Sequence, residues 1–291
     1  MVAPGLSLIA IVGPTASGKT GLSIEIAKRY GGEIIAADSR TVYKGLDIGT
    51  AKPTMTERGG IVHWGFDLVS PGESFSAADF QHYARAKVRE IASRGKLPII
   101  VGGTGLYVDA FLYDYSFAPA DMAKRKQLEG LGVIELQQQI AKQGLAMPEN
   151  NQNRRHLVRT LERAHSQPTK RSLMKGAAII GLNPDKEVLR GRITKRADMM
   201  LAAGVIDEVA WAFKTYGDES EAVTGGIYRV FRDVIRGELP KEDAIKLFVT
   251  SDVQLAKRQM TWFRRNPDIQ WFGDAETALT WFDKAFGGTL K

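Results

Sequence analysis

The sequence predicts an α/β protein with a doubly wound parallel sheet, a mainly helical insert and a helical C-terminal part. A short apolar run, a loop and an amphipathic helix follow one another three times before residue 113. The first of these loops has the spacing of glycine, lysine and threonine that binds phosphate. After residue 185, apolar residues recur mainly at helical spacing. Together these observations indicate a P-loop NTPase-like fold.

Composition and charge are those of an ordinary folded domain. Of the 291 residues, 44% are hydrophobic and 25% are charged, so the chain can form one large domain, or one domain that carries an insert. The net charge of +7 favours polyanionic partners. The absence of cysteine excludes disulfides and thiolate chemistry, and we expect a cytoplasmic protein. The apolar N-terminal stretch is too short to cross a bilayer, so we expect no membrane partner.

The loop after the first apolar run is the strongest signal in the sequence. Its glycines let the backbone curl so that successive N–H groups converge on a phosphate, and the next helix N-terminus adds partial positive charge. Lys19 supplies a cation for the outer phosphate oxygens, and the Thr20 hydroxyl suits a magnesium ion bound to them. The predicted phosphate-binding residues are Gly13, Pro14, Thr15, Ala16, Ser17, Gly18, Lys19 and Thr20.

Strands and helices alternate over the first 113 residues. Apolar runs between turn residues predict the strands, and apolar residues three and four apart predict the helices. We expect strands over 6–12, 33–37, 61–69 and 97–101, and helices over 19–30, 77–94 and 106–112. Ser76 is the expected N-cap of the second helix. The polar, glycine-containing stretch 40–53 is expected to be an ordered functional loop.

The pattern changes after residue 113. Residues 114–174 are irregular and polar, with helical segments near 133–139 and 153–164, and we interpret them as a small helical insert. Residues 1–113 and 175–291 then form one phosphate-loop core. In its second half we expect strands over 177–182 and 269–272, helices over 185–203, 205–216, 226–237 and 241–265, and a terminal helix.

Two further strand ends carry candidate chemistry. The carboxyl ends of parallel strands meet at one edge of a sheet, so we expect Asp38 and the turn 102–105 beside the phosphate loop. Asp38 suits a carboxylate that holds magnesium through a bound water, or a general base, and it also suits a simple cap on the next turn. An ATPase or nucleotide kinase normally has an aspartate at the end of a later strand. Here the strand 97–101 ends in Gly102-Gly103-Thr104 instead.

Basic residues gather in two later segments. Arg155, Arg159 and Arg163 lie four apart and therefore share one helix face. The stretch 257–265 places lysine and arginine beside tryptophan and phenylalanine. Arginine beside aromatic rings suits single-stranded RNA, although a charge run is more often a solvated helix face. Arg229 is a candidate phosphate clamp.

Four stretches together resemble the tRNA dimethylallyltransferase (isopentenyltransferase) family. They are Gly13–Thr20, the pair Asp38–Tyr43 and Asp47–Pro53, Gly102–Tyr107, and Leu255–Arg264. Many phosphate-loop proteins share the first stretch, whereas the set of four, in this order over most of the chain, is specific to the family.

The resemblance implies transfer of a dimethylallyl group from dimethylallyl diphosphate to the N6 amine of the adenosine 3′-adjacent to the anticodon (adenosine-37), in tRNAs that read codons beginning with U. The implied catalytic residues are Asp38 as the base, Thr104 near the reacting atoms, and Lys19 and Arg229 on the leaving diphosphate, with Mg2+ at Thr20. The implied tRNA contacts are Asp38, Ser39, Arg40, Thr41, Arg155, Arg159, Arg258 and Gln259. The insert 114–174 would contact the anticodon stem-loop, and one monomer would suffice.

The sequence departs from the family pattern at Trp64, where the family has a second histidine, and at Ile227, where it has glycine. Other activities stay open. A prenyltransferase for free adenine nucleotides needs no extended basic surface, and a small-molecule kinase normally has the strand-end aspartate that is missing here. A non-enzymatic RNA-binding protein has no use for Lys19 and Asp38 at one sheet edge.

Overall fold

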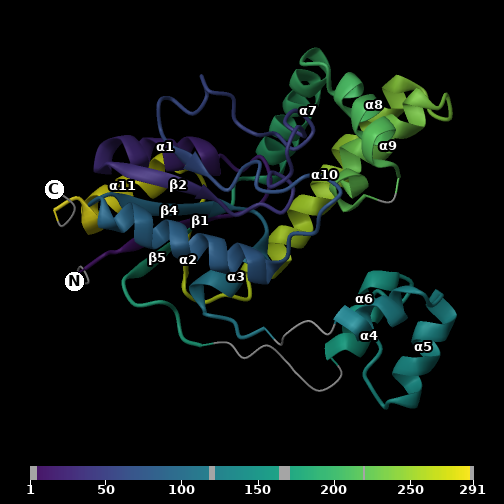
Figure 1. Cartoon of the computed structure of the whole chain (residues 1–291). Helices are drawn as coiled ribbons and strands as arrows, with labels where there is room; N and C mark the ends of the chain where they lie inside the picture. The colour runs from purple at the N-terminus through teal and green to yellow at the C-terminus, as the bar shows by residue number, and fades with distance from the viewer. Residues whose placement is uncertain (1–4, 118–121, 164–170, 219, 289–291) are drawn as a thin grey trace. The chain divides into compact units, whose positions relative to one another are not determined.

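The computed structural model describes residues 5–117, 122–163, 171–218 and 220–288. The chain forms two compact units, one of Met1–Tyr113 with Leu173–Lys291 and one of Asp114–Ser172 (Figure 1). We call them the core unit and the insert unit. Each has its own cluster of buried apolar side chains.

A parallel sheet lies at the centre of the core unit. Six strands are present in the described ranges, in the order β3-β2-β4-β1-β5-β6, and every pair is parallel. All residues of β1, β2 and β4 are buried, as in a sheet covered on both faces. The strands are β1 (Leu8–Val12), β2 (Gly32–Ala36), β3 (His63–Trp64), β4 (Leu97–Gly102), β5 (Ala177–Leu182) and β6 (Ile269–Phe272).

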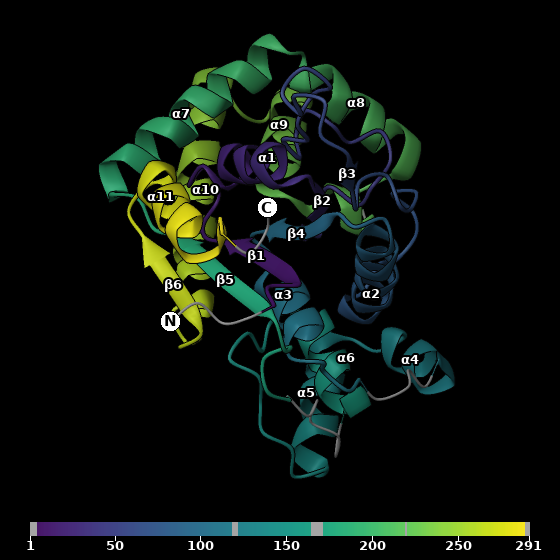
Figure 2. The ribbon, with the colours of Figure 1, turned by 90° about the vertical axis from the view of Figure 1, so that its left-hand side faces the viewer.

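Helices cover both faces of this sheet, which confirms the doubly wound prediction (Figure 2). On one face α1 and α11 share a core with β1, in which Leu22 and Phe282 pack with Ile9. On the other face α2 packs on α3, and Phe80 stacks on Tyr107 with ring centroids 4.7 Å apart. The helices of the core unit are α1 (Lys19–Tyr30), α2 (Ala77–Ser93), α3 (Gly105–Leu112), α7 (Lys186–Ala202), α8 (Val205–Tyr216), α9 (Gly226–Ile235), α10 (Lys241–Phe263) and α11 (Ala275–Phe286), with a 3-10 turn η1 (Glu221–Thr224).

The C-terminal helices form a second core that reaches the 40–53 loop. Ile193 of α7, Val209 of α8, Phe231 of α9 and Phe248 of α10 belong to one buried cluster. Val42, Tyr43 and Leu46 belong to the same cluster. The loop is therefore held between the sheet edge and these helices, which explains why a stretch without regular structure is ordered. Among the described residues, no helix is long and apolar enough to span a membrane.

The expected strand over 61–69 is wrong in length, because β3 has only two residues. Gly65 and Asp67 have φ angles of 90° and 56°, which a strand does not accommodate. Extended pairing reappears only as a single bridge between Tyr43 and Val69. The expected Ser76 cap is confirmed, since its hydroxyl accepts a hydrogen bond from the Asp79 N–H at 3.2 Å.

The insert unit is a small helical bundle. Its helices are α4 (Met122–Glu129), α5 (Val133–Lys142) and α6 (Arg154–Arg163). Leu128, Leu136 and Leu157, one from each helix, pack in its core. The helices expected near 133–139 and 153–164 are confirmed, whereas α4, which is largely polar, was not expected. Residue 164 itself lies outside the described ranges.

Candidate active site

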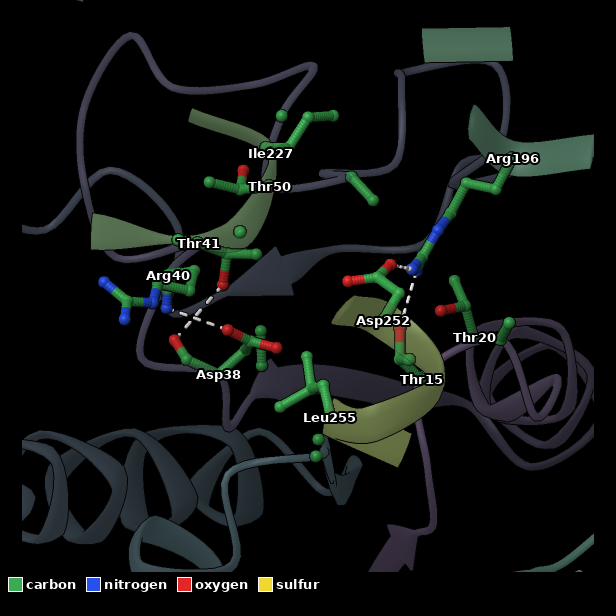
Figure 3. A pocket seen from close by; sticks show the side chains of 18 of the residues that line it. Thr15, Thr20, Asp38, Arg40, Thr41, Thr50, Arg196, Ile227, Asp252 and Leu255 are labelled. Atoms are coloured by element: carbon green, nitrogen blue, oxygen red, sulfur yellow. Dashed lines mark hydrogen bonds and ion pairs between the residues drawn. The ribbon is translucent and has the colours of Figure 1, made fainter. Parts of the chain in front are cut away.

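A cavity of about 350 Å³ opens at the carboxyl edge of the sheet (Figure 3). This volume lies in the range of small-molecule sites. Figure 3 shows Asp38, Arg40 and Thr41 on one side, and Thr15, Thr20, Arg196 and Asp252 on the other. The predicted site residues among those that line the cavity are Thr15, Ala16, Lys19, Thr20, Asp38, Arg40, Thr41, Arg229, Arg258 and Gln259.

The phosphate loop joins β1 to α1 in a conformation that requires glycine. Gly13 has a φ of 142°, and a Cβ there would lie 2.4 Å from the Leu182 carbonyl oxygen of β5. Gly18 has a φ of 97° and directly precedes α1. Pro14 and Ser17 shape the loop from within, since the Ser17 N–H donates to the Pro14 carbonyl at 3.2 Å. The loop therefore places the N-terminus of α1 against the cavity.

Lys19 is the cation of this loop. Its ammonium donates to the Pro14 carbonyl oxygen at 2.6 Å and lies 3.5 Å from the Ser17 hydroxyl. Desolvation lowers the pKa of Lys19 to about 8, and the positive charge of Arg196 acts in the same direction, while Asp38 opposes the shift. Since the hydrogen bonds of this desolvated ammonium go to its own loop within the described ranges, it gains from an anionic ligand.

Asp38 lies two residues after the end of β2 and lines the cavity. Its Oδ1 accepts a hydrogen bond from the Arg40 N–H at 2.8 Å, so it also caps the turn, as the simpler interpretation expects. The other carboxylate oxygen has no such role in the turn. The Arg40 guanidinium donates to the Glu221 carbonyl at 2.7 Å and to the Thr224 hydroxyl at 3.1 Å, so it fastens this turn to η1.

Thr104 lies behind the Asp38 turn and is not a lining residue of the cavity. Its hydroxyl accepts a hydrogen bond from the Ser39 N–H at 3.0 Å. A Cβ at Gly102 would lie 2.0 Å from the Ala37 carbonyl oxygen, so the ends of β2 and β4 are in close contact. In this structure Thr104 therefore positions the turn that carries Asp38.

Gln259 of α10 bridges two of the loops. Its Oε1 accepts a hydrogen bond from the Thr15 N–H at 2.7 Å, and its Nε2 donates to the Gly103 carbonyl at 3.1 Å. A Cβ at Gly103 would lie 2.3 Å from that nitrogen. The amide of Gln259 is thus engaged inside the core unit, where it sets the spacing between the phosphate loop and the β4 turn.

Sequence reasoning missed two residues on the same wall, Arg196 of α7 and Asp252 of α10. Arg196 Nη1 donates to the Thr15 hydroxyl at 2.6 Å, and its Nη2 is paired with the Asp252 carboxylate. One turn earlier, Arg192 donates to the Ser17 carbonyl at 3.2 Å. The spacing of the two arginines was the available signal, but it is shared by many solvated helix faces.

A carboxylate and a lysine outside the cavity hold the 40–53 loop. Glu208 of α8 accepts hydrogen bonds from the N–H groups of Asp47, Ile48 and Gly49 at 2.8, 2.7 and 2.8 Å, and from the Tyr228 hydroxyl at 2.8 Å. Lys52 is buried and donates to the Tyr43 carbonyl at 2.6 Å and to Asp47 at 2.7 Å. These contacts bring Tyr228, and the adjacent Arg229, to the cavity.

The remaining predicted residues lie in the insert unit. Arg159 is exposed on α6. Arg155 and Arg163 belong to the same helix, but their side chains lie outside the described part of the chain.

The residues at Thr20 and Asp38 fit a magnesium ion. Thr20 is exposed at the start of α1 and lines the cavity together with the Asp38 carboxylate. Magnesium in phosphate sites takes one or two protein oxygens and completes its shell with water and phosphate. The described residues contain no group of three or more His, Cys, Asp or Glu side chains that would hold a metal without a phosphate ligand.

A glycine-rich loop at the carboxyl edge of a parallel sheet, with cations from α7, α9 and α10 around it, defines an α/β protein with a P-loop NTPase-like fold. The chain belongs to the IPP transferase family, whose model matches residues 41–266.

Individual relatives agree with this assignment. A tRNA dimethylallyltransferase of Bacillus velezensis is 41% identical over 281 residues, which cover 91% of this chain and 90% of the relative. The structure of a tRNA isopentenylpyrophosphate transferase from Bacillus halodurans matches with a TM-score of 0.75 and 36% identity, and covers 97% of this chain and 96% of its own. A eukaryotic dimethylallyltransferase acting on tRNA matches with a TM-score of 0.74 and 25% identity, over 97% of this chain and 76% of its own.

Proposed function

We propose that this protein transfers the dimethylallyl group of dimethylallyl diphosphate to the N6 amine of the adenosine 3′-adjacent to the anticodon, in tRNAs that read codons beginning with U. The observation that carries the proposal is the presence of Asp38 and the cationic phosphate loop in one cavity. The names of the relatives, tRNA dimethylallyltransferase and tRNA isopentenylpyrophosphate transferase, support it.

The proposed reaction is a substitution at the allylic carbon that carries the diphosphate. The amine nitrogen forms a bond to this carbon, the carbon–oxygen bond breaks, and the diphosphate leaves with the bonding electrons. Asp38 accepts the proton that the amine loses, because its second carboxylate oxygen is not used by the Arg40 turn. Thr104 acts by holding this turn through Ser39.

The leaving diphosphate is stabilised by charge. Lys19, Arg229 and the N–H groups of the phosphate loop surround the position where negative charge develops, and such preorganised donors stabilise the transition state. Magnesium, held at Thr20, would neutralise part of the same charge when bound. No phosphoryl group moves, which explains why a strand-end aspartate that positions water is not required.

The basic surfaces would bind the RNA. The adenosine must leave the stacked anticodon loop to reach Asp38, which costs a few kcal/mol. Arg258 at the cavity, together with Arg155 and Arg159 of the insert unit, would contact the phosphates of the anticodon stem-loop. One cavity handles one anticodon loop, so we propose a monomer that acts in the cytoplasm.

A transfer assay tests the proposal. The protein is incubated with labelled dimethylallyl diphosphate, magnesium and unmodified tRNA, beside the same tRNA with guanosine in place of the target adenosine. We expect label in the first tRNA alone. Label in free AMP but in neither tRNA would favour a nucleotide prenyltransferase, and label in both tRNAs would refute the proposed target.

A further inference from the structure

Two of the three guanidinium nitrogens of Arg196 contact other side chains in the described part of the chain. Its two terminal nitrogens contact the Thr15 hydroxyl and the Asp252 carboxylate. Its Nε is buried and, within the described part of the chain, has no hydrogen-bond partner. A buried charged donor without a partner is costly, so its persistence points to a ligand that supplies an acceptor.

The surroundings of Arg196 indicate an anionic acceptor. Arg196 lines the cavity beside the phosphate loop, and its charge contributes to the lowered pKa of Lys19. An anion placed between Lys19 and Arg196 would offset the repulsion between their two positive charges. Figure 3 shows Arg196 beside Thr15 and on the same side as Thr20, where the phosphates of a ligand would lie.

Asp252 is placed to orient the guanidinium of Arg196, with which it is paired. It is 8% exposed, and burial raises the pKa of its carboxyl, while the charge of Arg196 opposes the shift. A carboxylate next to a phosphate site repels an anionic ligand, and here the paired Arg196 cation offsets that repulsion. Its contact with Nη2, combined with that of Thr15 with Nη1, fixes the plane of the guanidinium and hence the direction of the Nε–H.

We propose that Arg196 binds an oxygen of the departing diphosphate through its Nε–H, and that Asp252 is the residue that positions Arg196 for this contact. The proposal deepens the proposed function and rests on it for the identity of the ligand. It adds α7 and α10 to the elements that act on the leaving group, beside the phosphate loop and Arg229 of α9.

Calorimetric titration with inorganic pyrophosphate, in magnesium buffer and without tRNA, tests the contact. Arg196→Gln should weaken pyrophosphate binding about 10- to 100-fold, the range for a hydrogen bond to a charged group. Lys195→Gln, an exposed cation one residue earlier on α7, is the matched control and should leave the affinity unchanged. An affinity of Arg196→Gln within twofold of the wild type would overturn the proposal.

A double variant guards against misfolding. Arg196→Gln alone leaves Asp252 buried without its cation, whereas Arg196→Gln with Asp252→Asn leaves no unpaired buried charge. The double variant should unfold at a temperature near that of the wild type and still bind pyrophosphate weakly. Wild-type affinity in a folded double variant would also overturn the proposal.

The positioning role of Asp252 is tested by the sign of its effect. If Asp252 only repels phosphate, both Asp252→Asn and Asp252→Leu should bind pyrophosphate more tightly than the wild type. If it positions Arg196, Asp252→Asn keeps an acceptor oxygen and retains affinity, whereas Asp252→Leu loses it by about fivefold or more. Equal affinities for the two variants would refute the positioning role. A protein that binds pyrophosphate through Arg196 but transfers no prenyl group would refute the proposed function alone.

Discussion

Asp38→Asn is the substitution that isolates proton acceptance most cleanly. Asp38 Oδ1 accepts the Arg40 N–H at 2.8 Å, and an asparagine side-chain oxygen can accept the same bond. The turn, and with it the Ser39 contact to Thr104, should therefore persist. What is lost is the carboxylate that takes the proton from the amine.

The expected effect is large and confined to the chemical step. Removal of a general base lowers rates by about 10²- to 10⁴-fold, which corresponds to about 3–5 kcal/mol of barrier. The midpoint of thermal unfolding should stay near that of the wild type because the cap is retained. The affinity for tRNA should also stay near normal, because phosphate contacts dominate that affinity.

Single-turnover kinetics measure this step directly. The enzyme is loaded with labelled dimethylallyl diphosphate and mixed with saturating tRNA, and label in tRNA is followed with time. Asp198→Asn, an exposed carboxylate of α7, is the matched control and should react at the wild-type rate. A rate for Asp38→Asn within threefold of the wild type would remove the base assignment and leave Asp38 as a turn cap.

Three further outcomes are expected. Since the pKa of Lys19 is lowered to about 8, the affinity for pyrophosphate in calorimetry should be full below pH 8 and should fall about tenfold per pH unit above it, as the ammonium loses its proton. Lys19→Arg should show no such fall, and a flat profile for the wild type would contradict the role of Lys19. In filter binding, Arg159→Ala and Arg258→Ala should each reduce the slope of log affinity for tRNA against log salt by about 0.7–0.9, whereas unchanged slopes would make them solvated charges. Gly13→Ala should abolish pyrophosphate binding and lower the free energy of unfolding in denaturant titration by about 1–3 kcal/mol, because the added Cβ would lie 2.4 Å from a β5 carbonyl oxygen. Normal binding would contradict the close packing of the loop.

The parts of the fold that follow from local chemistry were predictable from the sequence. Strands of four to six residues and helices with regular apolar spacing appear where expected. The central strands β1 and β4 are the clearest case, because burial on both faces leaves long apolar runs. The 61–69 prediction failed because Gly65 and Asp67 adopt positive φ angles within an apolar stretch. The α4 helix was missed because most of its side chains are polar.

The site was predictable only where it follows the strand ends. Gly13–Thr20 and Asp38 are placed by the topology of a parallel sheet, which the sequence reveals. Arg196 and Asp252 come together across 56 positions of sequence, and a charged residue on an amphipathic helix looks the same whether it faces solvent or a cavity. Glu208, which binds three loop N–H groups, was hidden for the same reason.

The balance of products tests the central claim, that the phosphate loop holds a diphosphate that departs rather than a nucleotide whose phosphoryl group moves. Pyrophosphate, orthophosphate and prenylated adenosine in tRNA are quantified in two parallel reactions that both contain dimethylallyl diphosphate and tRNA, one without ATP and one with it. We predict one pyrophosphate for each prenyl group that enters tRNA, and no orthophosphate. Orthophosphate release that depends on ATP, with no prenyl group in tRNA, would contradict the account.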